Sequence, residues 1–206
     1  MNQKPGVVTP AQRVRHGAAA SCPTMSLCLH TAEHLVGLRP AELRACAAVL
    51  RAAVATGARI FTFGNGGSAA TASHLACDLT GRGRGPTGRR ARVRTLYDAA
   101  TTTAIANDHG YDEVFCRLLD GDAEPDDVAV AISVSGRSRN VVRALEAARR
   151  GGVVTVGLLG GDGGAARPLC DVAVTVPCID YGVVESVHLA VVSTETTGPA
   201  TAGART

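Results

Sequence analysis

Long hydrophobic runs are missing from this sequence of 206 residues. No stretch approaches the roughly 20 apolar residues that a membrane-spanning helix needs, and the first residues lack the continuous apolar segment of a signal peptide. The chain also has little net charge, a formal +3 at pH 7, which does not demand a polyanionic partner. From these absences we expect a cytoplasmic protein that does not bind membranes.

Motifs for nucleotides and for paired cysteines are missing as well. The sequence has no GxxxxGK(S/T) phosphate loop, and the glycines of GNGGS at residues 64–68 are not spaced like GxGxxG. The seven cysteines show no CxxC spacing, so we expect most of them to be buried, reduced thiols. No nucleotide cofactor is expected.

Aromatic residues make up only 3% of the chain, and none lies in the basic run GRGRGPTGRRARVR at residues 81–94. Nucleic-acid platforms usually add stacking aromatic residues to their basic grooves. We therefore interpret the run as a solvated loop that joins a helix to a strand. A nucleic-acid partner is not expected.

What the chain does have is enough apolar content, 46%, to bury one sizeable core. The length predicts a single domain over residues 25–193, between a mobile tail at 1–24 and a C-terminal tail at 194–206. Apolar residues recur roughly at helical spacing from residue 26 to 56, and Pro40 is predicted to divide them into two helices.

Four short apolar runs then combine with helical patterns. Continuous apolar strands that alternate with amphipathic helices are typical of a parallel sheet covered on both faces, so we predict an α/β fold with a doubly wound, mainly parallel sheet. In such sheets, ligands bind outside the carboxyl ends of the strands. The predicted strands cover residues 58–63, 127–133, 153–159 and 171–176, and helices cover 69–79 and 139–150.

Two loops rich in glycine and serine follow the first two predicted strands. A helix N-terminus offers unpaired N–H groups and a partial positive charge, so small residues and hydroxyls there suit an anion. The same residues could instead serve only tight turns and helix caps. Two such loops in one chain favour a small phosphorylated metabolite. The residues are Gly64, Gly66, Gly67 and Ser68 in the first loop and Ser133, Ser135, Gly136 and Ser138 in the second.

Four segments carry a family resemblance: FGNGGSAATASHLACDLTGR, AIANDHGYDEVF, ISVSGRSRNVVRALEAARRGGVVTVGLLGGDGG and DVAVTVPCIDYGVVESVH. They resemble the sugar isomerase (SIS) domain family, and within it the phosphoheptose isomerases, over about residues 30–192. The resemblance implies that Val134 replaces a hydroxyl residue of the phosphate site. It implies a substrate site made of Ser68, Ser133, Ser135 and Ser138 for the phosphate, Gly66 and Gly67 in the same loop, and Asn65 and Asp108 for the sugar hydroxyls.

Phosphoheptose isomerases interconvert sedoheptulose 7-phosphate and an aldose phosphate, which needs a base for a carbon-bound proton and an acid or cation for the oxygen. The resemblance implies Asp78 as the base, with Glu185 and His188 handling the oxygen proton. Some members hold zinc, and the corresponding ligands here are His74, Asp78 and Glu185. Where the family has a further His, this chain has Ser193, a poor acid and a poor zinc ligand.

Two interpretations follow. The first is an aldose–ketose isomerase that acts on a phosphorylated sugar. The second is a non-catalytic SIS-domain protein that binds a phosphosugar or a protein partner, which Ser193 favours. The pairs His74–Asp78 and Glu185–His188 could also be ordinary surface pairs on helices. The family further implies a homotetramer with bundled N-terminal helices.

Overall fold

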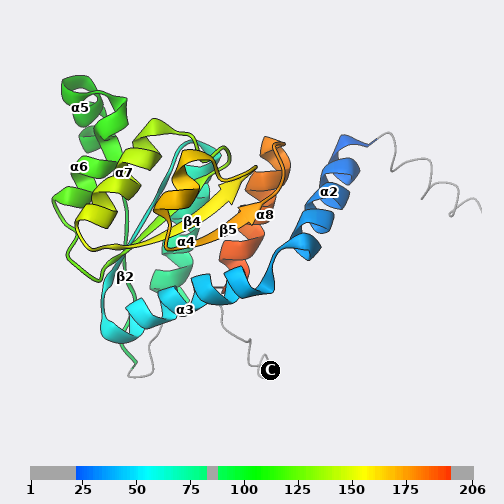
Figure 1. The fold of residues 1–206 in the computed structure, drawn as a ribbon, viewed down its shortest axis with the longest axis horizontal. Coiled ribbons are helices and arrows are strands. Elements are labelled where there is room, and N and C mark those ends of the chain that lie inside the picture. Colours follow the sequence, from blue (N-terminus) through cyan, green and yellow to red (C-terminus); the bar gives the residue numbers. More distant parts are fainter. Residues whose placement is uncertain (1–21, 83–87, 196–206) are drawn as a thin grey trace, which may run out of the picture.

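The computed structural model describes residues 22–82 and 88–195, which form an α/β fold around a parallel sheet (Figure 1). Its strands lie in the order β2-β1-β3-β4-β5, and every neighbouring pair is parallel. The predicted fold class is confirmed. The strands are β1 (Arg59–Gly64), β2 (Arg92–Thr95), β3 (Val128–Ser133), β4 (Val154–Gly160) and β5 (Val172–Val176).

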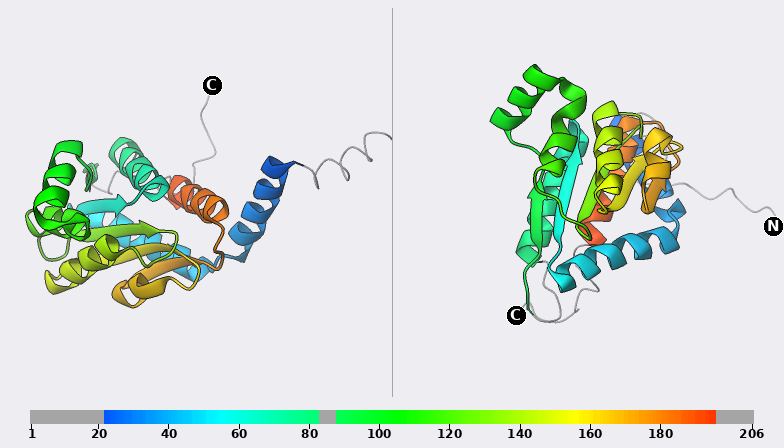
Figure 2. Two further views of the ribbon diagram at one scale, coloured as in Figure 1. Left: turned by 90° about the horizontal axis from the view of Figure 1, so that it is seen from above. Right: turned by 60° about the vertical axis from the view of Figure 1, so that its left-hand side comes forward.

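Helices cover both faces of the sheet (Figure 2). On one face lie α3 (Pro40–Thr56), α4 (Gly67–Arg82) and α8 (Tyr181–Glu195); on the other lie α5 (Ala99–His109), α6 (Val114–Asp120), α7 (Arg139–Arg150) and the short 3-10 helices η1 (Tyr111–Glu113) and η2 (Gly164–Leu169). Successive side chains of a strand point to opposite faces. On β1, Ile60 therefore packs in the hydrophobic core on the face that α3, α4 and α8 cover, and Phe61 and Phe63 pack in the core on the opposite face.

Prolines begin both N-terminal helices, α2 (Pro23–Gly37) and α3. Proline suits the first helical position because the N–H group that it lacks would have no partner there. The predicted division at Pro40 is thus confirmed. Helix α2 starts two residues before the predicted domain boundary, and α8 ends two residues after the other boundary. Most of both predicted tails lies outside the described residues.

The basic run at 81–94 is not wholly a loop, so that prediction is partly wrong. Residues 92–95 form the edge strand β2, which pairs with β1 from Arg92 opposite Arg59 to Thr95 opposite Thr62. An edge strand has one paired side and an open one, so charged residues are tolerated along it. Residues 83–87 of the run lie outside the described part.

All seven cysteines are free thiols, but only Cys46, Cys116 and Cys170 are buried, so the expectation that most are buried is wrong. Burial raises the pKa of Cys116 and of Cys170 to about 11, which keeps both thiols protonated and unreactive. The expectation fails partly because helix α2, which carries Cys28, buries none of its residues.

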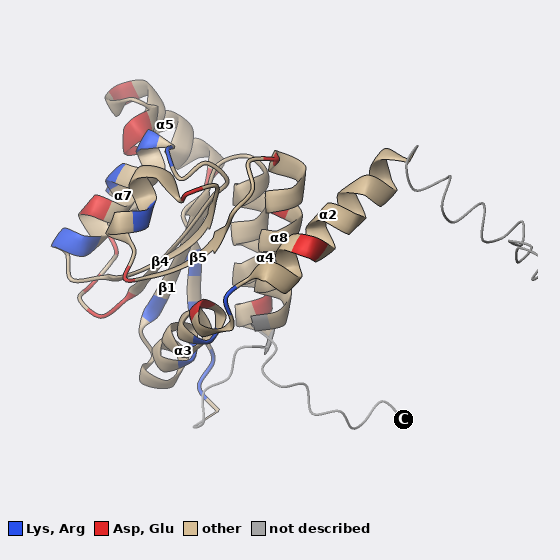
Figure 3. Cartoon of the chain, turned by 45° about the vertical axis from the view of Figure 1, so that its right-hand side comes forward, with Lys and Arg blue, Asp and Glu red and all other residues tan. Residues whose placement is uncertain are grey.

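Charge is unevenly spread over the fold. Figure 3 shows charged residues on α7 and few of them on α2, α4 and α8. Within the described residues, no helix has both the length and the apolar character that crossing a membrane requires.

The strand order places a ligand site. The chain steps from β1 outward to β2, and then returns past β1 to β3. Where the order reverses in this way, the loops after the two strands diverge and leave a crevice at the carboxyl edge of the sheet. The loops after β1 and β3 are the two glycine–serine loops.

Candidate active site

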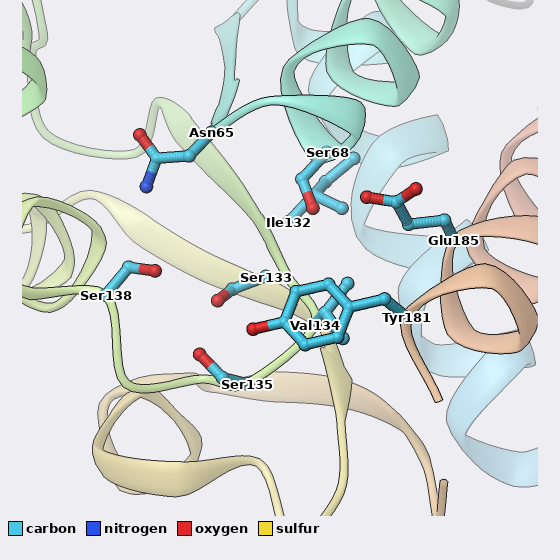
Figure 4. A pocket seen from close by; sticks show the side chains of 9 residues that line it. All are labelled: Asn65, Ser68, Ile132, Ser133, Val134, Ser135, Ser138, Tyr181 and Glu185. Carbon is cyan, nitrogen blue, oxygen red and sulfur yellow. The ribbon is translucent and has the colours of Figure 1, made fainter. Parts of the chain in front are cut away.

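The two glycine–serine loops line one pocket with an empty volume of about 320 Å³ (Figure 4). Ser68 comes from the start of α4, and Ser135 comes from the loop between β3 and α7. The two loops that the sequence analysis assigned to a phosphorylated metabolite therefore line the same pocket. The lining residues are Asn65, Ser68, Ile132, Ser133, Val134, Ser135, Ser138, Tyr181 and Glu185.

The serine hydroxyls are arranged to donate hydrogen bonds into this pocket. Ser133 Oγ accepts the N–H of Gly136 at 3.1 Å, and Ser135 Oγ accepts the N–H of Arg137 at 3.2 Å. One lone pair of each oxygen is thus used within the loop, and the proton of each hydroxyl can be donated to a ligand. Ser138 stands at the N-cap of α7, yet its hydroxyl makes no capping bond to the helix. Together with the positive ends of α4 and α7, these hydroxyls suit a phosphate.

Among the residues that the structure describes, Glu185 is the only charged one that lines the pocket. Its carboxylate lies so close to Gly67 that a Cβ on this glycine would come within 2.3 Å of Glu185 Oε1. Gly67 begins α4, so the carboxylate stands beside the positive end of that helix. Gly66 precedes it with a φ of +54°, a left-handed conformation that glycine adopts without strain.

A second polar cluster lies further along α4 and α8, and we call His74, Asp78 and Ser193 the α4–α8 seam. His74 Nε2 lies 3.3 Å from Asp78 Oδ2 and 3.2 Å from Ser193 Oγ. The Ser193 hydroxyl donates to Leu189 O at 2.9 Å, so its oxygen is the acceptor toward His74. His74 Nε2 therefore carries a proton. A Ser-His-Asp triad would use both ring nitrogens, so the seam is not one.

Comparison with known proteins shows which family has this sequence and fold. The model of the SIS domain matches residues 29–160. The chain belongs to the SIS domain family. A phosphoheptose isomerase from a Nitratiruptor species is 42% identical to this SIS domain over 131 residues, which cover 64% of this chain and 70% of the relative. The phosphoheptose isomerase of Rhodospirillum rubrum is 39% identical over 145 residues, covering 70% and 77%.

A solved structure agrees with these sequence relatives. The phosphoheptose isomerase from Neisseria gonorrhoeae matches this SIS domain with a TM-score of 0.76 and 28% identity, covering 91% of this chain and 97% of that chain. The SIS domain described here is thus a member of the phosphoheptose isomerase group, as the sequence segments indicate.

The zinc ligands that the resemblance implies do not converge in this SIS domain. Among the described residues, no three His, Cys, Asp or Glu side chains stand close enough together to hold a metal ion. His74 directs its protonated Nε2 at Asp78 and Ser193, and Glu185 lies at the pocket instead. A zinc site needs at least three protein ligands that converge on one point. This donor set does not fit a zinc ion, and no catalytic step is assigned to one.

His188 does not reach the pocket, which corrects its predicted catalytic role. Its side chain is only 1% exposed and lies buried between α8 and the sheet. Burial lowers the pKa of His188 to about 4, although the nearby backbone of Leu159 opposes the shift. The imidazole is therefore neutral at pH 7, and it is a core residue that does not line the pocket.

Asp108 is also outside the pocket within one chain. It is exposed on the last turn of α5, where it accepts a hydrogen bond from Asn107 Nδ2 at 2.8 Å. The other predicted substrate residues, Asn65 and the four serines, line the pocket together, with Gly66 and Gly67 beside them.

Sequence reasoning missed Tyr181 and Ile132, both of which line the pocket. Tyr181 lies four residues before Glu185, hence one turn away on the same face of α8. That spacing was the available signal. Figure 4 shows its ring across the side of the pocket opposite Asn65.

Proposed function

We propose that this protein is an aldose–ketose isomerase whose substrate is a phosphorylated sugar, with sedoheptulose 7-phosphate as the best candidate. The observation that carries the proposal is the convergence of two serine loops and one carboxylate, Glu185, on a single pocket. Its membership of the phosphoheptose isomerase group names the reaction.

The phosphate is bound by neutral donors. Ser68, Ser133, Ser135 and Ser138 supply hydroxyls, and the N-termini of α4 and α7 supply backbone N–H groups and a positive dipole. Such an arrangement holds a phosphate without a lysine or arginine among the lining residues. The sugar chain then extends away from the two loops.

The sugar extends toward the α4–α8 seam. A helix rises about 1.5 Å per residue, so Asp78 lies about 15 Å along α4 from Ser68. An extended seven-carbon chain covers much of that distance. Side chains on a helix tilt toward its N-terminus, which directs the Asp78 carboxylate back toward the pocket.

Isomerisation moves one proton between adjacent carbons and one between their oxygens. In the ketose-to-aldose direction, Asp78 takes a proton from C1, giving an enediol, and returns it to C2. A proton passes from O1 to O2 at the same end of the sugar. Glu185 is not assigned to this transfer, because its carboxylate stands against Gly67, about 16 Å along α4 from Asp78. His74 donates to Asp78 and keeps its carboxylate in place, with Ser193 as a further contact of the same ring nitrogen. Proton transfer by positioned carboxylates is general acid–base catalysis.

The test is deuterium exchange. Purified protein is incubated with sedoheptulose 7-phosphate in heavy water, with and without added zinc, and the recovered sugar is examined by mass spectrometry and NMR. The expected result is deuterium on the carbon that receives the returned proton. Absence of exchange in both samples would contradict the proposal.

The second candidate is a non-catalytic SIS-domain protein that binds a phosphosugar or regulates a protein partner. Ser193, which supplies only a hydroxyl at the seam, is the observation that favours it. Tight binding of sedoheptulose 7-phosphate by calorimetry, without exchange in heavy water, would support this candidate over the enzyme.

The protein is further proposed to work as a homo-oligomer, with a tetramer as the expected state. Helices α2 and α5 bury none of their residues within one chain, although α2 exposes apolar side chains such as Leu29 and Val36. Such a face gains stability by packing against another copy. Light scattering gives the mass directly, and a monomer would contradict the proposal. The free cysteines fit a reducing cytoplasm.

A further inference from the structure

The side-chain amide of Asn65 is held on two sides by other side chains. Its Nδ2 donates to Asn140 Oδ1 at 2.9 Å, and its Oδ1 accepts from Asn140 Nδ2 at 2.9 Å and from the Tyr111 hydroxyl at 3.0 Å. Asn140 lies in the first turn of α7 and is buried, and Tyr111 begins η1. We call Tyr111 and Asn140 the Asn65 clamp.

The orientation of both amides follows from a group that can only donate. The backbone N–H of Val141 donates to Asn140 Oδ1 at 2.9 Å. A backbone N–H has no lone pair to offer, so the Asn140 atom that faces it must be the oxygen. Asn140 Nδ2 is then the atom left to donate, and Asn65 must turn its Oδ1 toward it. The Tyr111 hydroxyl meets the same oxygen and must also donate.

This orientation decides what Asn65 can offer a ligand. An amide oxygen has two lone pairs, and here Asn140 and Tyr111 use both. Of the two hydrogens on Asn65 Nδ2, one goes to Asn140. The second hydrogen is the hydrogen-bonding group that is left. Figure 4 shows the nitrogen of Asn65 on the side of Ser138 and the oxygen turned away from it.

Ion pairs tie η1 to the helix that carries the rest of the clamp. Asp112 contacts Arg139 at 3.0 Å, and Glu113 contacts Arg143. Both arginines belong to α7, which also carries Asn140 and begins after Ser138. Tyr111 is therefore fixed relative to the second phosphate loop and not only to Asn65.

We propose that Tyr111 and Asn140 are positioning residues that make Asn65 an obligate hydrogen-bond donor to an oxygen acceptor of the bound phosphosugar. The inference deepens the proposed function and rests on it for the identity of the ligand. It predicts that both residues act through Asn65 and that neither needs to touch the ligand.

The test is a double-mutant cycle on binding. Tyr111→Phe removes only the hydroxyl of a side chain that is 56% exposed, so the fold is expected to survive. Tyr97→Phe is the matched control, because Tyr97 is 61% exposed and lies outside the pocket lining. Both substitutions are made in the native chain and in Asn65→Ala, and the Kd for sedoheptulose 7-phosphate is measured by calorimetry.

Tyr111→Phe is expected to raise the Kd about fivefold in the native chain, as the loss of one orienting neutral hydrogen bond implies. In the Asn65→Ala background the same change has no further effect, since the residue through which Tyr111 acts is gone. A merely structural role would weaken binding equally in both backgrounds. Asn140→Asp gives a second arm, because it keeps the oxygen that faces Val141 and removes the donor to Asn65.

Three outcomes overturn the proposal. Tyr111→Phe behaves like Tyr97→Phe, or its effect persists in full without Asn65, or the native protein binds neither sedoheptulose 7-phosphate nor inorganic phosphate. If Tyr111→Phe raises the Kd for sedoheptulose 7-phosphate alone, the proposal is supported and the acceptor oxygen lies on the sugar. If it raises the Kd for inorganic phosphate equally, the proposal is supported and the acceptor oxygen lies on the phosphate. Because binding is measured, a protein that binds without isomerising refutes the enzyme and leaves the clamp standing.

Discussion

Removal of the Ser135 hydroxyl is expected to weaken phosphosugar binding without weakening the fold. Ser135 lines the pocket, and its oxygen accepts the exposed N–H of Arg137 at 3.2 Å, which water can satisfy in its place. A hydrogen bond to a charged group contributes about 1.5–3 kcal/mol. Ser135 is half-buried, so the lower value applies, and this corresponds to an affinity loss of about tenfold.

Ser133 gives the contrast that makes this prediction sharp. Its side chain is buried, and its oxygen accepts the buried N–H of Gly136. Ser133→Ala therefore leaves a buried donor without a partner, which costs about 1–3 kcal/mol of folding free energy in addition to the affinity. Ser135→Ala loses affinity alone.

The assay is titration calorimetry with sedoheptulose 7-phosphate, together with urea unfolding of the same samples. Ser73→Ala is the control, because this exposed hydroxyl on α4 bonds to Ala69 O and lies outside the pocket lining. A Kd for Ser135→Ala within twofold of the native value would refute the reasoning. So would a loss of unfolding free energy as large as that of Ser133→Ala.

Four further predictions follow from the same geometry. Asp78→Asn is expected to abolish deuterium exchange while the Kd stays within about threefold of native, as Asp78 lies far from the phosphate donors; retained exchange would reject Asp78 as the base. The pKa of His188 is about 4 in the folded protein and 6.5 in the unfolded chain, so the unfolded state binds the extra proton, and the free energy of unfolding falls by about 3 kcal/mol as the pH drops from 6.5 to 4. Urea unfolding at a series of pH values measures this fall. His188→Leu should flatten it, and a pH profile that the substitution leaves unchanged would contradict the burial argument. Dialysis against EDTA is expected to leave the rate of deuterium exchange within about twofold of the untreated protein, because the described residues of the seam do not form a set of metal ligands. Elemental analysis is expected to find less than one zinc per chain, and stoichiometric zinc in the purified protein would contradict this prediction. A five-carbon ketose phosphate is expected to bind through its phosphate but to exchange at least about tenfold more slowly, since it is too short to extend along α4 to Asp78; equal rates would place the base nearer the pocket.

The phosphate pocket could be predicted from the sequence because its determinants are local. A strand that ends in glycine or serine and leads into a helix fixes both the loop and the helix N-terminus over a few residues. The parallel order of the strands then brings the two loops to one edge. Ser68 and Ser135 meet in the pocket for this reason, although they are far apart in the chain.

The edge strand β2 could not be predicted in the same way. Its four residues alternate arginine with valine and threonine, a pattern with little apolar content. Pairing with β1 stabilises it, and such pairing depends on a partner more than 30 residues earlier in the chain. Local sequence does not encode a strand whose stability comes mainly from its neighbour.

The burial of His188 had a signal that the family resemblance obscured. On α8, Val184 lies four residues before His188 and Val191 lies three residues after it, and both valines are buried. These spacings place His188 in the middle of the apolar stripe of the helix. Glu185 follows Tyr181 by four residues and stands at the pocket instead. Glu185 and His188 are only three residues apart on α8, yet Glu185 lines the pocket and His188 is buried in the core.

Helix α4 connects the two halves of the proposed reaction. Its first turn supplies phosphate donors, and its fourth turn supplies Asp78, so the distance between anchor and base is set by the pitch of a single rigid helix. Helix α8 runs beside it, with Glu185 against Gly67 and Ser193 against His74. A substrate that is anchored at the loops must therefore extend along these helices to meet the base. Chain length is then selected by helix geometry, and Asn65, which lies on the opposite side of the pocket from Tyr181, selects for an oxygen near the anchored end.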